Sequence, residues 1–254
     1  MSRRPEPALV QRVLNRDRTW SAYALADLDP RYAEGTSWLA DDDAAVLLFR
    51  GLQPPVLFAT GDPQQTASLL ADLPPGPIQF TLQATHRALL KDRLLADKEI
   101  KMWRMVLEPE AFPGLESQAC QPLGPADLPA VEALMADHLD RPDGFASFQL
   151  ADGTFFGIWH ADRLLAMAGT HVISESMGVA ALGNVFTAPE ARGQGLGRAV
   201  SAAATANLVA LGLPTIVLNV SMQNEVACNL YRHLGYRPYC GYYEGIGRLL
   251  ARPQ

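Results

Sequence analysis

The sequence predicts an α+β protein made of two parts of similar build, each a sheet flanked by helices. Apolar periodicity, with glycines and prolines as breakers, predicts the order β-β-α-β-α-β in the first half. The second half has a similar order, in which strands near Phe155, Leu165 and Val179 precede a helix, a strand, a helix and a strand. A stretch rich in proline, glycine and glutamate, residues 108–125, lies between the halves. We therefore expect two domains, residues 1–118 and 119–254, whose similarity a gene duplication would explain.

The elements of the first half follow from runs of apolar residues and the breakers between them. Strands are expected at residues 44–50, 55–59, 78–84 and 100–107. Helices are expected at residues 20–28, 64–73 and 87–97, and the first helix of the second domain at residues 128–138. Proline ends two of these helices, at Pro30 and at Pro74-Pro75-Gly76.

The most informative segment of the chain is a glycine-rich run, Arg192-Gly193-Gln194-Gly195-Leu196-Gly197. It follows an apolar, strand-like segment at residues 179–187 and precedes an alanine-rich, helix-like segment at residues 198–211. The first turn of a helix has unpaired backbone N–H groups and the positive end of the helix dipole, and glycine lets a phosphate come close to them. Arg192 and Arg198 add positive charge at the two ends. The run therefore predicts a site for an anion with linked phosphates.

Two better-known phosphate loops do not fit this run. A dinucleotide fingerprint would need a small residue in place of Val200, or a glycine in place of Arg198, depending on where it is taken to start. A Walker loop needs Gly-Lys followed by Ser or Thr, and no Gly-Lys pair occurs in the sequence. A glycine-rich turn that binds nothing is the remaining alternative.

The segment after the helix makes the pattern specific. A short strand at residues 216–220 is followed by the spacing Asn-x-x-Ala-x-x-x-Tyr-x-x-x-Gly-Tyr, which is Asn224, Ala227, Tyr231, Gly235 and Tyr236. Together with Pro-x-x-Arg-Gly-x-Gly-x-Gly before it, this pattern resembles the GNAT superfamily of acyl-CoA-dependent N-acetyltransferases. The resemblance covers about half of the chain, from roughly Leu123 to the C-terminus.

The resemblance implies a fold for both domains. Each would be a mixed, mostly antiparallel sheet flanked by helices, with the GNAT domain in the C-terminal half. The N-terminal half would be a degenerate GNAT-like domain, because Pro63-Gln64-Gln65-Thr66 stands where glycines would be needed. One cofactor site per chain is the consequence.

The resemblance also implies acetyl-CoA as the cofactor and assigns residues to it. The backbone of Val185, Phe186 and Thr187 would pair with the pantetheine arm, where the strands at residues 179–187 and 215–220 diverge. The diphosphate would be held by the loop residues Arg192, Gly193, Gln194, Gly195, Leu196, Gly197 and Arg198.

Asn224 and Tyr231 are the other two residues that the resemblance assigns to the site. Asn224 would hydrogen-bond the cofactor, and Tyr231 would act as the catalytic residue by protonating the departing thiolate. They are seven residues apart, or two helical turns, so a helix would carry both on nearly the same face. An ordinary half-buried tyrosine is the alternative interpretation of Tyr231.

The sequence does not assign a general base. Some well-characterised members of the family carry a glutamate in the strand that matches residues 179–186, where this chain has Asn184 and no acid. An asparagine can orient an amine or a water but cannot take a proton at neutral pH. His171 is the second candidate, with a purely structural histidine as the alternative. Glu175, in an expected hairpin turn, and Glu190, beside the glycine loop, complete the candidates.

Two functions of different kinds fit these residues. The first is an acetyltransferase that moves the acetyl group of acetyl-CoA to the amine of a small molecule or peptide by direct attack. The second is a non-catalytic acyl-CoA-binding sensor or interaction module. The acceptor segments are expected at residues 140–148 and in a turn at residues 240–245, and neither carries a recognisable code.

Composition limits the remaining classes. A net charge of -6, with three lysines among 21 basic residues, argues against a nonspecific nucleic-acid binder. No apolar stretch reaches the ~18 residues of a membrane helix, and no secretory signal is recognisable, so the cytoplasm is the expected location. The three cysteines lack metal-ligand spacing and are expected as thiols.

Three smaller features complete the picture. The acidic run Asp41-Asp42-Asp43 is expected as a solvated turn that could draw a cationic acceptor. The preference for arginine over lysine is typical of a GC-rich bacterial genome. The sequence leaves open whether the protein is a monomer or a homodimer.

Overall fold

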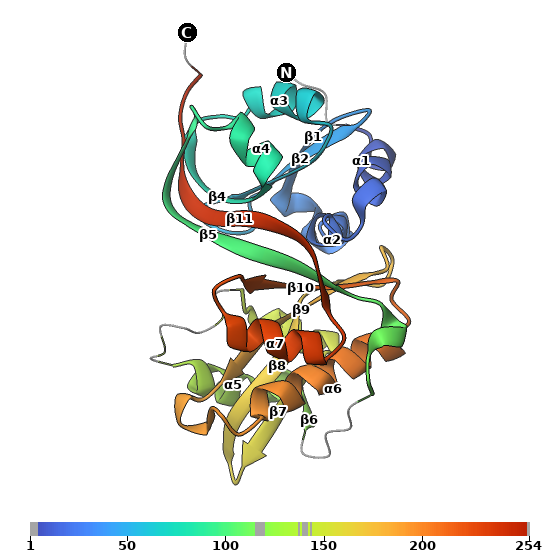
Figure 1. The fold of residues 1–254 in the computed structure, drawn as a ribbon, viewed down its shortest axis with the longest axis vertical. Helices are drawn as coiled ribbons and strands as arrows, with labels where there is room; N and C mark the ends of the chain where they lie inside the picture. The colour runs from blue at the N-terminus through green and yellow to red at the C-terminus, as the bar shows by residue number, and fades with distance from the viewer. Residues whose placement is uncertain (1–4, 115–119, 137, 139–141, 143, 253–254) are drawn as a thin grey trace. The chain divides into compact units, whose positions relative to one another are not determined.

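The computed structural model describes residues 5–114, 120–136, 138, 142 and 144–252. The chain forms two compact units (Figure 1). Unit 1 consists of residues 1–105, 220–225 and 238–254, and unit 2 of residues 106–219 and 226–237. The two units therefore interleave along the chain. The expected limits, residues 1–118 and 119–254, are consecutive and stay a prediction about separately folding parts.

Unit 1 contains a mixed sheet with helices. Its strands are β1 (Thr36–Asp41), β2 (Ala44–Phe49), β3 (Val56–Gly61), β4 (Gly76–Gln83), most of β5 (Leu94–Leu107) and most of β11 (Arg237–Leu249). Its helices are α1 (Pro7–Leu14), α2 (Ala22–Ala26), α3 (Pro63–Ala71) and α4 (Ala84–Leu89), with 3₁₀ turns at Asn15–Asp17 and Pro30–Gly35. β1, β2 and β3 are antiparallel neighbours, whereas β3 and β4 run parallel and are connected through α3.

The C-terminal strand β11 completes the core of unit 1. It runs antiparallel to β4, from Tyr242 opposite Gln83 to Leu249 opposite Gly76. Leu249 is buried in the same apolar cluster as residues of β2, β3 and β4. Tyr242 lies 5.7 Å from the guanidinium carbon of Arg104, which is 1% exposed and also stacks on Trp20 and Tyr23. The last residues of the chain therefore fold with the first hundred.

Unit 2 contains the remaining strands, again with both antiparallel and parallel pairs. Its strands are β6 (Gln121–Leu123), β7 (Phe155–His160), β8 (Arg163–Ser174), β9 (Val179–Thr187) and most of β10 (Thr215–Ser221). Its helices are α5 (Leu128–Met135), α6 (Leu196–Ala210) and α7 (Glu225–His233), with 3₁₀ turns at Pro109–Ala111, Pro125–Asp127, Ser147–Asp152 and Pro189–Ala191. β6 to β9 are antiparallel neighbours, whereas β9 and β10 run parallel and are connected through α6.

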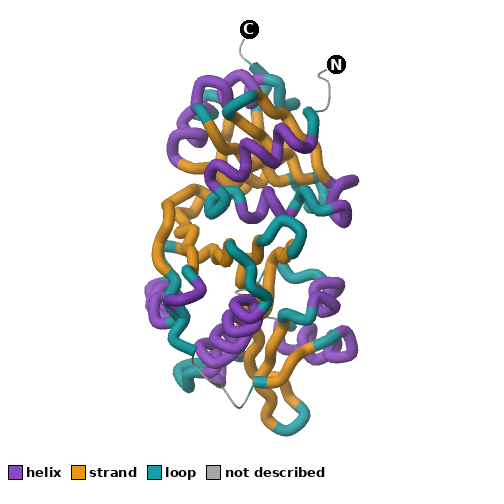
Figure 2. The backbone as a smooth tube through the Cα atoms, turned by 90° about the vertical axis from the view of Figure 1, so that its right-hand side faces the viewer, coloured by secondary structure: helices purple, strands orange, loops and turns teal. Residues whose placement is uncertain are grey.

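The expected similarity of the two halves is confirmed. In unit 1 the order β1-β2-β3-α3-β4-α4 matches β7-β8-β9-α6-β10-α7 in unit 2, and in each a parallel strand pair is joined by a helix, α3 or α6. Helices accompany the strands in both units (Figure 2). Within the described residues, no helix is long and apolar enough to cross a membrane. Cys120, Cys228 and Cys240 form no disulfide there, as expected.

Several helices and strands differ in length or position from the elements that the sequence predicted. The helix expected at residues 87–97 is the short α4, and β5 already begins at Leu94. Leu94 is 4% exposed in the apolar cluster of unit 1, so its burial in the sheet outweighs the helical propensity of the Leu-Leu-Ala run. α2 and α5 are also shorter than expected, and α1 and β1 were not predicted.

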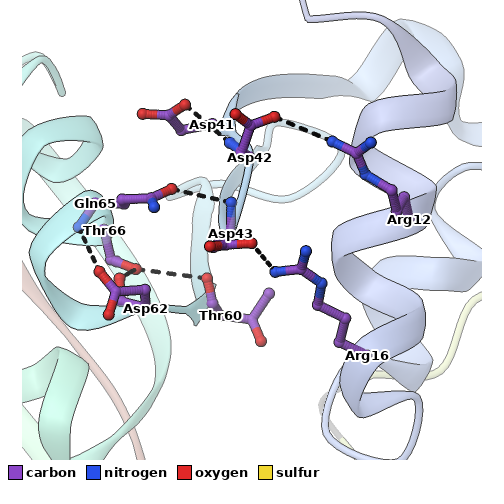
Figure 3. Close-up of polar contacts among 9 residues, drawn as sticks. All are labelled: Arg12, Arg16, Asp41, Asp42, Asp43, Thr60, Asp62, Gln65 and Thr66. Carbon is purple, nitrogen blue, oxygen red and sulfur yellow. Dashed lines mark hydrogen bonds and ion pairs between the residues drawn. The ribbon is translucent and has the colours of Figure 1, made fainter.

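The acidic run in unit 1 is a turn in which two of the three carboxylates form ion pairs (Figure 3). Asp42 accepts a hydrogen bond from Arg12 at 3.1 Å, and Asp43 pairs with Arg16, both arginines coming from the first helical segment. These ion pairs offset the negative charge, so the turn offers little attraction to a cationic acceptor.

The same region closes the first turn of α3. The carboxylate of Asp62 accepts hydrogen bonds from the backbone N–H groups of Gln64 and Gln65, each at 3.0 Å. The side chain of Gln65 in turn accepts the N–H of Asp43 at 2.9 Å (Figure 3). The helix N-terminus that corresponds to the glycine loop is thus capped by the chain's own acid.

A partly buried acid at the end of α2 makes the stability of the fold depend on pH. Burial raises the pKa of the Asp27 carboxyl from 3.8 to about 7. Between these values the folded state binds a proton that the unfolded chain has released, so stability falls as the pH rises. We expect Asp27→Asn to increase the free energy of unfolding by roughly 1–3 kcal/mol at pH 8 and to change it little at pH 4.

Urea unfolding at the two pH values measures this effect. The matched control is Asp72→Asn, since Asp72 also follows a helix, α3, but is exposed. An equal change for the two variants at pH 8 would show that Asp27 is not the group responsible.

Candidate functional site

The glycine loop of unit 2 adopts a backbone that only glycine takes easily. Gly193 and Gly195 have φ angles of 78° and 80°, and Gly195 is the residue at which α6 begins. A Cβ atom at either position would meet nothing within 4 Å. The two glycines therefore border open space at the start of the helix.

The first turn of α6 offers backbone donors to that space. Ala199 is the first residue whose N–H bonds back into the chain, to the carbonyl of Gly195 at 3.0 Å. Within the described part of the chain, no backbone hydrogen bond is donated by Leu196, Gly197 or Arg198, and no side chain caps the helix. Three N–H groups at the positive end of a helix dipole are the usual setting for an anion.

Arginines stand on both sides of these donors. Arg192 and Arg198 are exposed. The Nε of Arg192 donates to the carbonyl of Thr187 at 3.1 Å, and its guanidinium carbon lies 5.7 Å from the ring of Phe186. The contact holds Arg192 at the end of β9, next to the loop.

The parallel strands β9 and β10 separate before they end. Their pairing runs from Val179 opposite Thr215 to Leu182 opposite Leu218 and stops there. On its other edge β9 stays paired with β8 as far as Thr187 opposite Ala166. The backbone of residues 183–187 therefore has one strand edge that β10 does not cover, and this edge leads to the glycine loop.

Gly197 shows how closely the parts of the site pack. A Cβ atom there would lie 3.2 Å from Oγ1 of Thr187 and 3.9 Å from a methyl group of Leu230. The first turn of α6 therefore lies against both the end of β9 and helix α7.

Tyr231 is a buried phenol on α7. The residue is 8% exposed, and burial, with a smaller contribution from Cys228, raises its pKa to about 12. Its ring lies 6.1 Å from that of Tyr236, whose hydroxyl is 3.3 Å from Oγ1 of Thr205. No hydrogen bond of the Tyr231 hydroxyl is found in the described residues. The group is protonated at neutral pH and can donate its hydrogen.

The end of α7 matches the sequence expectation. Gly235 has a φ angle of 92°, and the N–H of Tyr236 donates to the carbonyl of Tyr231 at 3.0 Å. A Cβ at Gly235 would lie 2.3 Å from the carbonyl oxygen of Ala111. Only glycine fits this helix end.

Asn224 directly precedes α7 and is exposed. Its N–H donates to the carbonyl of Ser221 at 3.0 Å, within the segment 220–225 that folds with unit 1. Its position before the helix, rather than within it, means that the shared helix face with Tyr231 stays a prediction.

The candidate bases differ in what surrounds them. Nε2 of His171 accepts the backbone N–H of Asn184 at 3.3 Å, so that lone pair is engaged. Glu175 is exposed in a hairpin turn, as expected. Glu190 pairs with Arg163 at the surface, and a backbone hydrogen bond, with help from Arg163, keeps the pKa of Glu190 below its usual value.

Sequence reasoning missed Gln149, a buried residue of the turn Ser147–Asp152. It contacts Asn184, His171 and Ala146 through its carboxamide. A polar residue in a segment of no regular pattern gave no signal that could have identified it.

The structure tests only one of the two expected acceptor segments fully. Residues 140, 141 and 143 of the segment 140–148 lie outside the described residues. The prediction of a turn at residues 240–245 was wrong, because these residues lie inside β11. No cluster that could hold a metal ion occurs among the residues described.

Comparison with known proteins shows that the chain is similar to acetyltransferases. Residues 125–236 match the model of the acetyltransferase (GNAT) family. A mycothiol acetyltransferase of Paenarthrobacter aurescens is 34% identical over 114 residues, which is 44% of this chain and 32% of that protein. One of Actinosynnema mirum is 37% identical over 86 residues, 34% of this chain and 28% of its own length. The chain thus spans about a third of the length of the curated relatives it matches.

Solved structures match over nearly the whole chain. A GNAT-family acetyltransferase of Novosphingobium aromaticivorans, described as putative, is 21% identical with a TM-score of 0.61, covering 93% of this chain and 100% of its own. A Drosophila protein is 14% identical with a TM-score of 0.73, covering 99% of each chain. A tandem GNAT protein of the clavulanic acid biosynthesis pathway is 12% identical with a TM-score of 0.53, covering 96% of each. At these identities the likeness shows the fold alone, an α+β arrangement of a mixed sheet with helices.

Proposed function

Because residues 125–236 form a domain of the acetyltransferase (GNAT) family, we propose that this enzyme transfers an acetyl group from acetyl-CoA to the amine of a small molecule or peptide. The observation that carries the proposal is the open first turn of α6 at the end of an uncovered strand edge. A chain of linked phosphates followed by an extended arm fits that combination of donors.

The residues of the loop fit a diphosphate. Gly193 and Gly195 leave open space in front of the N–H groups of the first helical turn. Gln194 and Leu196 contribute backbone from the same loop, and Arg192 and Arg198 supply charge. The donors, the dipole and the charges act on the same anion, so their contributions reinforce one another.

The strand edge fits the arm that joins the diphosphate to the thioester. In an extended strand, neighbouring residues turn their N–H and C=O groups to opposite edges. The N–H of Ala188 donates to Leu165 on the β8 side, which directs the backbone groups of Phe186 the same way and those of Val185 and Thr187 to the uncovered edge. The carbonyl of Thr187 is already bound to Arg192, so Val185 is the main backbone partner that we propose for the arm.

Tyr231 is the residue that we propose as a hydrogen-bond donor to the leaving sulfur. When bound, acetyl-CoA supplies an activated acetyl group that the acceptor amine attacks directly. A phenol with a pKa of about 12 is a weaker acid than a thiol, which ionises near 8.5. The buried Tyr231 is therefore suited to donating a hydrogen bond to a thiolate rather than to giving up its proton completely. Asn224 is proposed as a further cofactor ligand on the resemblance alone.

The names of the curated relatives support acetyl transfer as the reaction. Since the chain spans about a third of their length, their acceptor is not carried over. We propose a cytoplasmic enzyme that acts on an amine, without nucleic acid or membrane as a partner. A non-catalytic acyl-CoA-binding sensor is the alternative, favoured by the engaged lone pair of His171 and the paired Glu190.

One assay separates the two functions. The protein is incubated with acetyl-CoA and a panel of small-molecule and peptide amines, and free thiol is followed over time. We expect thiol release that depends on the acceptor. Tight binding of acetyl-CoA without acceptor-dependent release across the panel would support the sensor instead.

Substituting Gly195 tests the loop as the diphosphate site. We expect Gly195→Val to weaken CoA binding by tenfold or more (~1.4 kcal/mol), since the side chain enters the space in front of the donors and valine disfavours a φ of 80°. The matched control is Gly212→Val, because Gly212 has a φ of 66°, open surroundings and a place at the other end of α6. Equal affinities for CoA in the two variants, measured by calorimetry, would remove the loop from the site.

Removing the hydroxyl of Tyr231 tests its role in turnover. We expect Tyr231→Phe to lower kcat by about 10- to 100-fold with little change in CoA affinity, because only the leaving sulfur loses a donor. Tyr236→Phe is the control, since its hydroxyl contacts Thr205 in the same buried region. If Tyr231→Phe and the wild type turn over at the same rate, the hydroxyl of Tyr231 does not assist the departure of the thiolate.

A further inference from the structure

A strained residue interrupts β9 just beyond the point where β9 and β10 separate. Asn184 has a φ angle of 50°, in the left-handed region that a non-glycine residue rarely adopts within a strand. Asn184 lies within one register shift between β8 and β9, between Met167 opposite Phe186 and Gly169 opposite Gly183, and a second shift follows between Thr170 and Val172. Such a conformation persists only where neighbouring groups hold it.

Hydrogen bonds that Asn184 donates to three residues hold it in place. Its side-chain Nδ2 donates to the carbonyl of Thr170 at 2.9 Å and to Oε1 of Gln149 at 3.2 Å. Its backbone N–H donates to Nε2 of His171 at 3.3 Å. The residue is 2% exposed, so each of these bonds is made away from bulk water.

Gln149 joins three parts of unit 2 through one carboxamide. Its Oε1 accepts the N–H of Ala146 at 2.8 Å in addition to Nδ2 of Asn184. Its Nε2 donates to the carbonyl of His171 at 2.8 Å. The side chain is 5% exposed. The turn before β7, strand β8 and the bulge in β9 therefore share a single buried group.

The ring of His171 fills the space between the same segments. A Cβ on Gly183 would lie 2.5 Å from the ring, and one on Gly144 would lie 3.2 Å from Nε2. Both glycines leave room for the imidazole. The segment 144–149 and the bulge thus meet at His171 as well as at Gln149.

The position of the bulge relates it to the reacting end of the site. The proposed arm site runs from the loop at Arg192 back along Thr187 and Val185, and Asn184 is the next residue. The end farthest from the phosphate loop is where an acceptor amine has to arrive. The segment 144–149 approaches this end through Gln149 and His171.

We propose that Gln149 is a positioning residue for the acceptor: together with Asn184 it ties the segment 144–149 to the bulge in β9. This inference rests on the proposed acetyl transfer. Loss of the carboxamide frees the segment and the bulge from each other, so the acceptor is held less well while the phosphate loop is unaffected.

Hydrogen exchange of the full chain without substrate tests the tie directly. In Gln149→Met, which keeps the volume and removes the polar atoms, we expect exchange to increase about tenfold in both peptides 144–150 and 183–187. The matched control is Gln79→Met, because Gln79 donates a comparable side-chain bond to the carbonyl of Pro54 in unit 1. Faster exchange in peptide 144–150 alone would overturn the tie.

Kinetics test the positioning role. In Gln149→Met we expect the KM for the acceptor to rise about tenfold while the dissociation constant of CoA stays within twofold of the wild type. Weakening of both to the same degree would mark a general loss of structure and overturn the proposal. A wild-type protein that binds CoA but releases no thiol would refute the proposed function and the kinetic role with it, whereas the exchange result still decides the tie.

A second variant separates the tie from backbone strain, and remains informative if Gln149→Met does not fold. Glycine adopts the left-handed conformation without strain. Asn184→Gly therefore removes the backbone strain together with the side-chain bonds to Gln149 and Thr170. We expect it to fold and to show the same rise in acceptor KM. Wild-type kinetics and exchange in Asn184→Gly would show that the bulge needs only its backbone conformation, which contradicts the proposal.

Discussion

The early separation of β9 and β10 is the constraint on which the rest of unit 2 depends. Backbone pairing between the two parallel strands ends at Leu182 and Leu218, although β9 continues to Thr187. An uncovered strand edge is a free-energy cost to the fold unless a ligand or water satisfies its polar groups. The bulge at Asn184, the glycine loop and the open turn of α6 follow one another along that edge. A single interruption of the sheet therefore accounts for the position of the extended site, ending in an anion site, that we propose.

The two units show how little sequence change separates a binding site from a structural helix end. In both, a parallel strand pair is joined by a helix that starts directly after a strand. In unit 1 the carboxylate of Asp62 occupies the first N–H groups of α3, whereas in unit 2 Gly195 leaves those of α6 exposed. A carboxylate that caps the helix would repel a phosphate as well as take its donors. The difference explains, in physical terms, why we propose one cofactor site in a chain with two similar halves.

Much of this arrangement could be predicted from the sequence, for reasons that are local. The alternating glycines before an alanine-rich helix predicted the loop, and Gly235 predicted the end of α7. Both features depend on backbone conformation within a few residues. Most strands along each half, though not β1, were predicted from apolar periodicity. The pKa of Tyr231 and the distances within the loop required the structure.

Other features could not be predicted, because they depend on residues far apart in the sequence. The pairing of β11 with β4 joins residues more than 150 positions apart, and nothing in residues 237–249 distinguishes one partner strand from another. The positioning role proposed for Gln149 depends on its hydrogen bonds to Asn184 and His171, which join separate parts of the sequence. Leu94 lies in a strand rather than a helix because the core of unit 1 needs an apolar residue there. Tertiary contacts decided each of these cases.

The most direct test of the central claim is a titration of the ¹⁵N-labelled protein with CoA, followed by the backbone amide signals. The open turn of α6 predicts large shifts for Leu196, Gly197 and Arg198, and none for Gln64 and Gln65, whose N–H groups bind Asp62. Binding of CoA that leaves the signals of residues 196–198 unchanged, or that shifts those of Gln64 and Gln65 instead, would contradict the assignment of the site to α6.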